Sequence, residues 1–335
     1  MTGKSFNIVI IGLILVTITA IISCSTPSND NDLVLRGDYL GQAPADTIPE
    51  LFAPGFISAG LNERDAAFSP DGDEFYYSIW LPTRKGVIMV TKRQDSRWTQ
   101  PQVAPFSGQY SDVEPFITAD GNKLYFASNQ PLVGAGEPKD YDIWFVEKDS
   151  LGWGKPQNLG KPVNTEGDEF YPSLTKTGTL YFTAPNNGSE DIFRSGFING
   201  NYADPENLGD SINSAAGEFN SLIAPDESFL IFSSFGRSDG LGGGDLYISF
   251  RIQDGIWTKA KNMGDKFNNN RLDYCPALSH DSKYFLYTRS IISSECADSV
   301  LKSYQDVTEL HKCPQNGNSD IYWIDSQVIN SLKPQ

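Results

Sequence analysis

Two adjacent carboxylates, Asp168 and Glu169, lie in the segment GDEFYPSLTKTGTLYF and could serve as the working acids of an enzyme. A glycoside hydrolase needs two carboxyl groups about 5–10 Å apart, one protonated and the other ionised. However, four other segments have an acid at the matching position, so the full set is Glu63, Asp112, Glu169, Glu218 and Asp273. Because an enzyme needs such an acid only once or twice, we expect the repeated acid to be a structural acceptor of backbone N–H groups. The alternative is a ring of carboxylates that binds a cation or a cationic ligand.

The position two residues after this acid differs between the segments, where it is Asp65, Glu114, Tyr171, Asn220 or Cys275. Alternation of side chains along a strand places this variable position on the same face as the repeated acid. Variation at one position of a repeated scaffold fits ligand contacts, and it also fits a tolerant, half-buried position. Asp65 and Glu114 are the pair that a glycoside hydrolase would use, and Tyr171 and Asn220 join them as candidates for ligand contact.

These positions belong to an internal repeat of about 50 residues that occurs five times. Each copy has two runs rich in β-branched and aromatic residues around a turn, followed by a third run that in four copies begins with an acid. The first four copies end in a fourth short strand that the fifth lacks, and PELFAPGFISAG, from Pro49, supplies it ahead of the first copy. This pattern predicts an all-β fold, a five-bladed β-propeller of four-stranded antiparallel blades closed by the N-terminal strand.

The turn motifs carry a family resemblance. Ser69-Pro70-Asp71-Gly72 and Ala119-Asp120-Gly121, together with third strands that begin Asp-Ile or Asp-Leu, resemble the WD40-like propeller repeats of the PD40 family, of the TolB type. The resemblance covers residues 49–325 and implies the propeller fold. Such families include periplasmic binding and scaffold proteins and propeller portions of peptidases, so the resemblance implies no particular activity.

The N-terminus has the features of an export signal. Lys4 precedes an apolar stretch from Ile8 to Ile22, which is shorter than the roughly 20 residues of a membrane-spanning helix. Ser23-Cys24 after it resembles the lipobox of bacterial lipoproteins. We expect a signal peptide over residues 1–23, lipid attachment at Cys24, and a polar tether over 24–48 that holds the protein at the cell envelope, on the outer membrane. The alternative is an ordinary secretory signal with an incidental cysteine.

Charge and cysteine content limit the partners and the kinds of chemistry that the protein can have. A formal net charge of −16 argues against nucleic acid as a partner, because phosphate binding needs clustered Lys and Arg. Cys296 and Cys313 lie in one insertion, residues 290–318, and in an oxidising compartment they predict a disulfide, whereas Cys275 predicts a buried free thiol. No spacing of Cys and His residues suggests a metal site, and we expect no cofactor. The sequence also lacks the GxSxG motif that a serine hydrolase would need.

Three long connections between second and third strands predict a second candidate surface on one face of the propeller. Arg237 and Tyr304 are its expected contacts. We expect residues 326–335 to be a C-terminal tail. The sequence therefore favours a non-catalytic envelope lipoprotein whose propeller binds a protein or glycan partner through its funnel and loop face. The alternative is a glycoside hydrolase or related carbohydrate-active enzyme that uses channel-mouth carboxylates.

Overall fold

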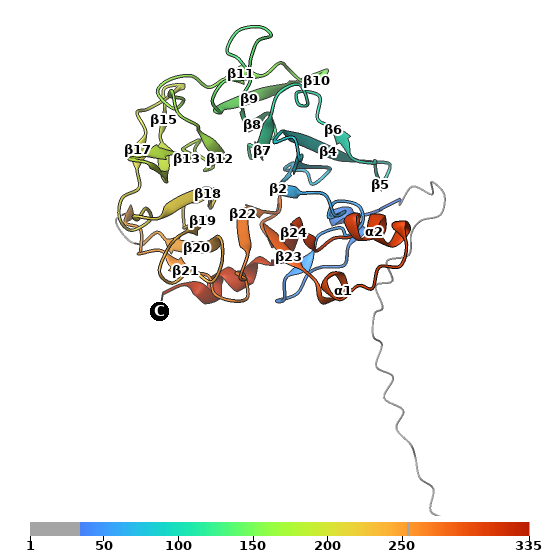
Figure 1. The fold of residues 1–335 in the computed structure, drawn as a ribbon. Coiled ribbons are helices and arrows are strands. Elements are labelled where there is room, and N and C mark those ends of the chain that lie inside the picture. Colours follow the sequence, from blue (N-terminus) through green and yellow to red (C-terminus); the bar gives the residue numbers. More distant parts are fainter. Residues whose placement is uncertain (1–33, 253–254, 335) are drawn as a thin grey trace, which may run out of the picture. The chain divides into compact units, whose positions relative to one another are not determined.

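Five small antiparallel sheets form a ring of blades in the computed structural model, which describes residues 34–252 and 255–334 (Figure 1). The predicted signal peptide and Cys24 lie outside the described residues. Among the described helices, none combines the length and the apolar composition that a membrane crossing requires. The arrangement confirms the predicted five-bladed β-propeller.

Every blade has the same order of strands from the centre of the ring outwards. The innermost strands are β2 (Glu63–Phe68), β7 (Asp112–Ile117), β12 (Phe170–Leu174), β18 (Gly217–Ile223) and β22 (Leu272–Leu278). The second strands are β3 (Glu74–Trp80), β8 (Lys123–Ser128), β13 (Leu180–Asn186), β19 (Phe229–Phe235) and β23 (Tyr284–Ile292). The third strands are β4 (Gly86–Gln94), β9 (Asp142–Asp149), β14 (Ser189–Ser195), β20 (Asp245–Phe250) and β24 (Asn316–Asp325). The outer strands are β6 (Gln102–Val103), β11 (Gln157–Asn158), β17 (Glu206–Asn207), β21 (Lys261–Asn262) and β1 (Glu50–Leu51).

Short additional strands form hairpins beyond the third strands. They are β5 (Arg97–Trp98), β10 (Gly152–Trp153), β15 (Phe197–Ile198) and β16 (Asn201–Tyr202). Because the third strand runs antiparallel to the second, these hairpins lie on the same face of the ring as the turns between first and second strands.

The N-terminal strand completes the last blade, as predicted. β1 pairs antiparallel with β24, with Glu50 opposite Trp323. The segment after β1 continues the junction, since the hydroxyl of Ser58 donates to the carbonyl of Ile321 and accepts the N–H of the same residue. The two ends of the ring are therefore joined by backbone pairing as well as by side-chain packing.

The turn motif explains why Ser-Pro-Asp-Gly recurs. In the first blade the hydroxyl of Ser69 donates to Asp71 at 2.5 Å and accepts the N–H of Glu74 at 2.8 Å. Gly72 adopts a φ of 73°, a left-handed conformation that glycine tolerates best. In the last blade the hydroxyl of Ser279 likewise donates to Asp281 and accepts the N–H of Tyr284, although Ser282 takes the place of glycine.

Apolar side chains from neighbouring blades fill the five interfaces between them. At the junction of the last and first blades, Phe52, Phe75 and Trp323 are completely buried in one cluster. Burial of a side chain of this size stabilises the folded state by about 1.5–3 kcal/mol, so the packing between blades contributes substantially to stability.

The predicted tether is too long. Residues 34–48 pack on the propeller: Arg36 forms an isolated bridge with Arg97, and Leu40, in the short 3-10 helix η1 (Asp38–Gly41), is buried in the cluster that joins the first and last blades. The apolar residues of this stretch, Leu35, Tyr39, Leu40 and Ala45, are scattered among polar ones without a helix or strand period, so their pattern did not reveal this contact.

The predicted C-terminal tail is also part of the fold. Residues Ser326–Leu332 form the 3-10 helix η3, whose Val328 and Ile329 are buried against the fourth and fifth blades. The propeller therefore continues beyond residue 325, because two adjacent apolar side chains find a site between these blades.

The insertion between β23 and β24 contains two helices, α1 (Ser294–Ala297) and α2 (Tyr304–His311). The predicted disulfide between Cys296 and Cys313 is wrong. Cys296 is a free thiol that donates to the carbonyl of Pro314 at 3.9 Å, and its N–H is bound by the N-cap residue Ser293, so the start of α1 sets its position. Cys275 is a buried free thiol, as predicted.

Candidate functional site

The repeated acids bind backbone N–H groups between blades, which is the structural role that their repetition predicts. Each is at most 2% exposed. Each accepts the N–H of the residue four positions earlier, and the five donors are Ala59, Gly108, Thr165, Ser214 and Asn269. The carboxylate thereby fixes the loop that leads into every innermost strand.

The variable position has the same unusual backbone in all five blades. Its φ lies between 49° and 64° each time, in the left-handed region. The pairing with the second strand shifts register at this point in every blade, which marks a β-bulge. The simple alternation that the sequence predicts is therefore wrong here, because the bulge redirects the side chain towards those of the other blades.

The variable residues meet in the centre of the ring and form, with one cation, what we call the central plug. Its members are Arg64, Asp65, Glu114, Tyr171, Asn220 and Cys275. The Nε of Arg64 donates to both oxygens of Asp65, at 2.8 and 2.9 Å, and its Nη2 donates to Glu114 at 2.8 Å.

Contacts from opposite blades complete the plug. Glu114 accepts the N–H of Tyr171 at 2.7 Å and the side-chain amide of Asn220 at 3.0 Å. The thiol of Cys275 donates to Asn220 at 3.7 Å, and the hydroxyl of Tyr171 donates to the carbonyl of Pro276 at 3.0 Å. The structure thus brings four of the predicted ligand contacts together, but uses them to close the channel.

Asp65 and Glu114 lie side by side, yet their surroundings do not suit glycoside hydrolysis. Both are buried, and both are bound by Arg64. Burial raises the pKa of Glu114, an effect that the guanidinium of Arg64 opposes. A carboxyl pair that shares one buried cation and accepts protein hydrogen bonds leaves no place for a sugar and a water between the two groups.

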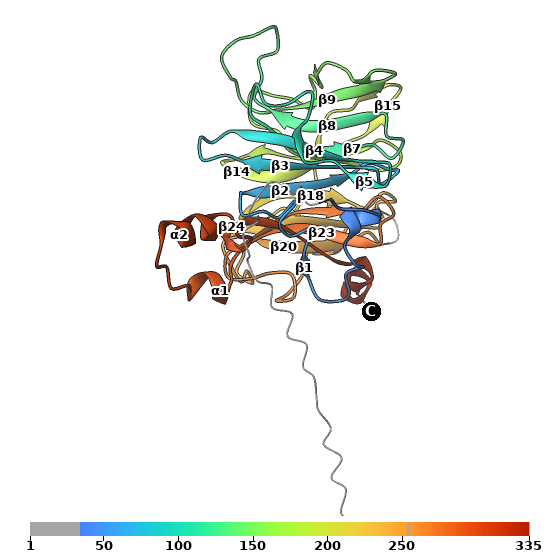
Figure 2. The same cartoon turned by 90° about the vertical axis from the view of Figure 1, so that its right-hand side faces the viewer.

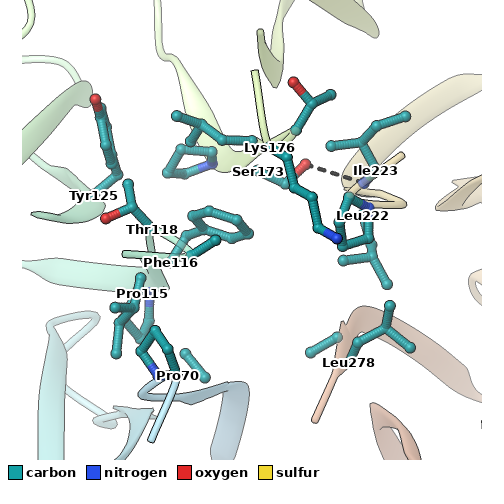
Figure 3. Close-up of a pocket in the computed structure, with 18 of the residues that line it drawn as sticks. Pro70, Pro115, Phe116, Thr118, Tyr125, Ser173, Lys176, Leu222, Ile223 and Leu278 are labelled. Carbon is teal, nitrogen blue, oxygen red and sulfur yellow. Dashed lines mark hydrogen bonds between the residues drawn. The ribbon is translucent and has the colours of Figure 1, made fainter. Parts of the chain in front are cut away.

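On one side of the plug the channel widens into a funnel with a cavity of about 700 Å³, whose floor includes Glu114 and Tyr171. Its walls are largely apolar and come from several blades, with Pro115, Phe116, Leu222, Ile223 and Leu278 among them (Figure 3). Leu174 also lines the cavity. The volume lies within the range of about 300–1,000 Å³ that is typical of ligand pockets.

The rim of the funnel is formed by the turns between first and second strands, and it is more polar than the walls. The side chain of Lys176 extends over the cavity in Figure 3. Asp120, Lys123 and His280 also line the rim. An apolar interior with a few polar groups is the usual composition of a ligand pocket.

Exposed apolar side chains also lie on the face where the funnel opens. They lie in the hairpins beyond the third strands, where Leu151 is 96% exposed, and the others are Phe197, Ile198, Ile252 and Ile256. Phe197 also lines the cavity itself. Exposed apolar groups on the face where a pocket opens can take part in an interaction surface.

The second predicted surface lies on the opposite face. Figure 2 shows α1 and α2 on one side of the ring and the hairpins of β5 and β15 on the other. Tyr304, on α2, is 84% exposed and available for contact. Arg237 is not: it forms a 2.9 Å ion pair with the buried Glu218, and its guanidinium lies 4.6 Å from the ring centre of Tyr247.

Sequence reasoning missed Arg64, Phe116 and Lys176. Arg64 occupies a position that is apolar in the other four blades (valine, phenylalanine or tyrosine), and this departure was the available indication of its role. Phe116 lies beyond the bulge of β7, where the alternation assumed for a regular strand no longer assigns side chains to a face, and Lys176 lies in the turn after β12, to which strand alternation does not apply.

The fold and the site together define a five-bladed β-propeller with a buried, charged plug and an apolar funnel open on one face. No protein-family model matches the chain, and no curated protein matches it. Solved structures do match, among them a putative TolB from Agrobacterium tumefaciens, at 15% identity over 68% of this chain and 70% of that one, with a TM-score of 0.46. TolB from Acinetobacter baumannii has 14% identity over 86% and 65%, with a TM-score of 0.46. The catalytic domain of an α-L-arabinofuranosidase from Coprinopsis cinerea has 10% identity over 84% and 97%, with a TM-score of 0.47. Similarities this distant establish neither a family nor a function.

Proposed function

We propose that the protein is a non-catalytic envelope lipoprotein whose propeller binds a partner, a protein in preference to a glycan, through its funnel. The observation that carries the proposal is the contrast between plug and funnel. The variable carboxylates are buried and bound by Arg64, whereas the funnel offers an open apolar cavity of about 700 Å³.

The chemistry of the walls supports a protein partner. A sugar presents a hydroxyl on most of its ring carbons and needs matching hydrogen-bond groups. Proline, leucine and phenylalanine side chains, such as Pro115 and Leu222, provide none. They do match apolar side chains of a polypeptide segment, and the exposed hairpin residues around the funnel enlarge the surface for a folded partner.

Envelope attachment rests on the N-terminal sequence. An apolar stretch followed by Ser23-Cys24 supports lipidation, and residues 25–33 would then link the lipid to the first described residues. A Cys24→Ala variant should lose membrane association while it keeps the folded propeller. Anchoring that persists in the variant would contradict the lipoprotein assignment.

The binding proposal is tested by cross-linking in the native envelope with variants on the two faces. Phe116→Lys places a charge in the funnel wall and Lys176→Glu reverses the charge at its rim, whereas Tyr304→Ala changes only the opposite face. We expect the two funnel variants to bind the cross-linked partner about tenfold more weakly, which corresponds to the loss of about 1.4 kcal/mol, and Tyr304→Ala to bind normally. Loss of binding in Tyr304→Ala alone would move the site to the loop face, and capture of a glycan alone would exclude a protein partner.

A further inference from the structure

Four of the five interfaces between blades place a basic side chain beside the buried acids. Arg237 pairs with Glu218 at 2.9 Å, and Arg289 pairs with Asp273 at 2.6 Å. Between the second and third blades, Lys139 pairs with Asp142 at 2.7 Å, and Asp142 is near enough to Glu169 to raise the pKa of that carboxyl in addition to the effect of burial.

The interface between the first and second blades follows the same pattern. Lys85 donates to the carbonyl of Gly108, the residue whose N–H is accepted by Asp112. The pKa of Asp112 is raised by burial, and the ammonium of Lys85 opposes this rise. A positive charge therefore accompanies the buried acids at each of these four interfaces.

The fifth interface, where the ring closes, differs. Glu63, at the start of β2, and Asp320, on β24, are 1% and 0% exposed, and no ion pair joins either of them to a Lys or Arg within residues 34–252 and 255–334. Their neighbours are in direct contact, because Asn62 accepts the N–H of Ser319 at 3.1 Å. The two buried carboxylates thus lie on adjoining segments of the first and last blades without a paired basic side chain among the described residues.

Each of these carboxylates also has one oxygen without a hydrogen-bond partner. The Oε1 of Glu63 accepts two backbone N–H groups, and the Oδ2 of Asp320 accepts the N–H of Gln315 at 2.7 Å. The Oε2 of Glu63 and the Oδ1 of Asp320 are buried and accept nothing from the described residues. Burial raises the pKa of Glu63 to about 8, with a further contribution from the charge of Asp320, and burial raises the pKa of Asp320 to about 6.

We propose that a divalent metal cation, Ca²⁺, binds between the Oε2 of Glu63 and the Oδ1 of Asp320 and closes the propeller ring. When both groups are ionised, the two carboxylates have a joint charge of −2, which a divalent ion neutralises and a single shared proton does not. Carboxylate oxygens are hard ligands of the kind that Ca²⁺ takes, and Ca²⁺ accepts backbone carbonyls in flexible geometry, whereas Mg²⁺ keeps several waters that a buried site accommodates poorly.

The site has only two acidic ligands. Among the described residues, no three His, Cys, Asp or Glu side chains gather as metal centres usually require. The remaining ligands are therefore backbone carbonyls, amide oxygens and water. The ion takes the part that Arg237 and Arg289 play at two other interfaces, and it holds the N-terminal segment to the last blade.

Thermal unfolding of the full chain at pH 7.5 tests the proposal, in EDTA, in millimolar CaCl₂ and in millimolar MgCl₂. Binding to the folded state alone should raise the Tm by about 5 °C in CaCl₂ relative to EDTA, at a concentration of about 100 times Kd. Asp320→Asn and Glu63→Gln should abolish the shift. Glu218→Gln, which changes the matching acid beside Arg237, should retain it.

Two further measurements apply to the unmodified protein, so that the test does not depend on variants that fold poorly. Equilibrium dialysis should find one Ca²⁺ per chain, and Ca²⁺ should slow hydrogen exchange in residues 58–63 and 315–321 more than in 214–218. Identical Tm values in CaCl₂ and EDTA, with no Ca²⁺ bound in dialysis, would show that no Ca²⁺ binds between the two carboxyl groups and would overturn the proposal. A shift that persists in both site variants, or an equal shift with MgCl₂, would also overturn it.

Discussion

Substitution of Arg64 by leucine should strongly destabilise the propeller. The Arg64 side chain is 15% exposed and serves two buried carboxylates, with contacts of 2.8 and 2.9 Å to Asp65 and 2.8 Å to Glu114. Removal of one partner from a buried ion pair costs about 3–5 kcal/mol, because it leaves an uncompensated charge. Glu114 keeps its hydrogen bonds from Tyr171 and Asn220, so we expect a loss near 3 kcal/mol.

The loss should depend on pH in a defined direction. Burial already raises the pKa of Glu114 above its unfolded value, and without Arg64 that pKa rises further. A carboxyl with a raised folded pKa contributes stability that is present below its unfolded pKa and lost as the pH rises through the folded pKa. The difference between Arg64→Leu and the natural protein should therefore be larger at pH 8 than at pH 5.

Urea unfolding followed by tryptophan fluorescence at the two pH values measures both effects. Arg93→Leu is a suitable control, because Arg93 pairs with the partly exposed Asp38 and Asp73 at the periphery and should contribute less than about 1 kcal/mol. If Arg64→Leu unfolds at the same urea concentration as the natural protein at pH 8, the plug is not held by this cation and the reasoning fails.

Three further predictions concern the closure of the ring by the N-terminal segment, the buried acids between blades, and the thiols of Cys275 and Cys296. Phe52→Ala should destabilise the protein by about 3–5 kcal/mol in urea unfolding, because Phe52 is completely buried where the ring closes, and a loss below 1 kcal/mol would contradict the closure by this segment. In EDTA, stability should fall from pH 5 to pH 8, since burial raises the pKa of Glu169 to about 7 and that of Asp273 to about 6, and such acids lose their contribution as the pH rises; a rise over this range would refute it. A thiol reagent should label Cys296 in the folded protein and Cys275 only in urea, because Cys275 is fully buried and burial raises its pKa, and peptide mapping that finds native Cys275 labelled would contradict the plug.

The fold could be predicted from the sequence because its turns, strands and repeated acids depend on local contacts that recur in each blade. The turn of Ser69, Asp71 and Gly72 uses contacts within six residues, so its motif survives in recognisable form in the other blades. The displaced strand at Glu50 could be recognised because the fifth copy of the repeat lacks its fourth strand and an additional strand precedes the first copy. The role of Glu169 followed from repetition in the same way, since a backbone acceptor is needed wherever the same loop occurs.

The site could not be predicted in the same way, because it depends on contacts between distant segments. The hydrogen bond from Asn220 to Glu114 joins residues in the second and fourth blades, and that from Tyr171 to Pro276 joins the third and fifth. No spacing within a repeat reports such pairs. The sequence did not predict the burial of Leu40 for the same reason, because its contacts belong to the first and last blades.

The geometry of a closed ring gives a physical reason for the variation that first suggested a ligand site. Five identical side chains directed to one axis would repel each other if they were acids and would overlap if they were large. A packed centre therefore requires unlike residues, here two acids that both bind Arg64, with Asn220 linking Glu114 to the thiol of Cys275. Diversity at this position is what closure demands, and it is no evidence of a ligand. Beyond the bulge the walls no longer meet at the axis, so residues such as Phe116 are free to contact something other than the propeller itself, and specificity should be sought there.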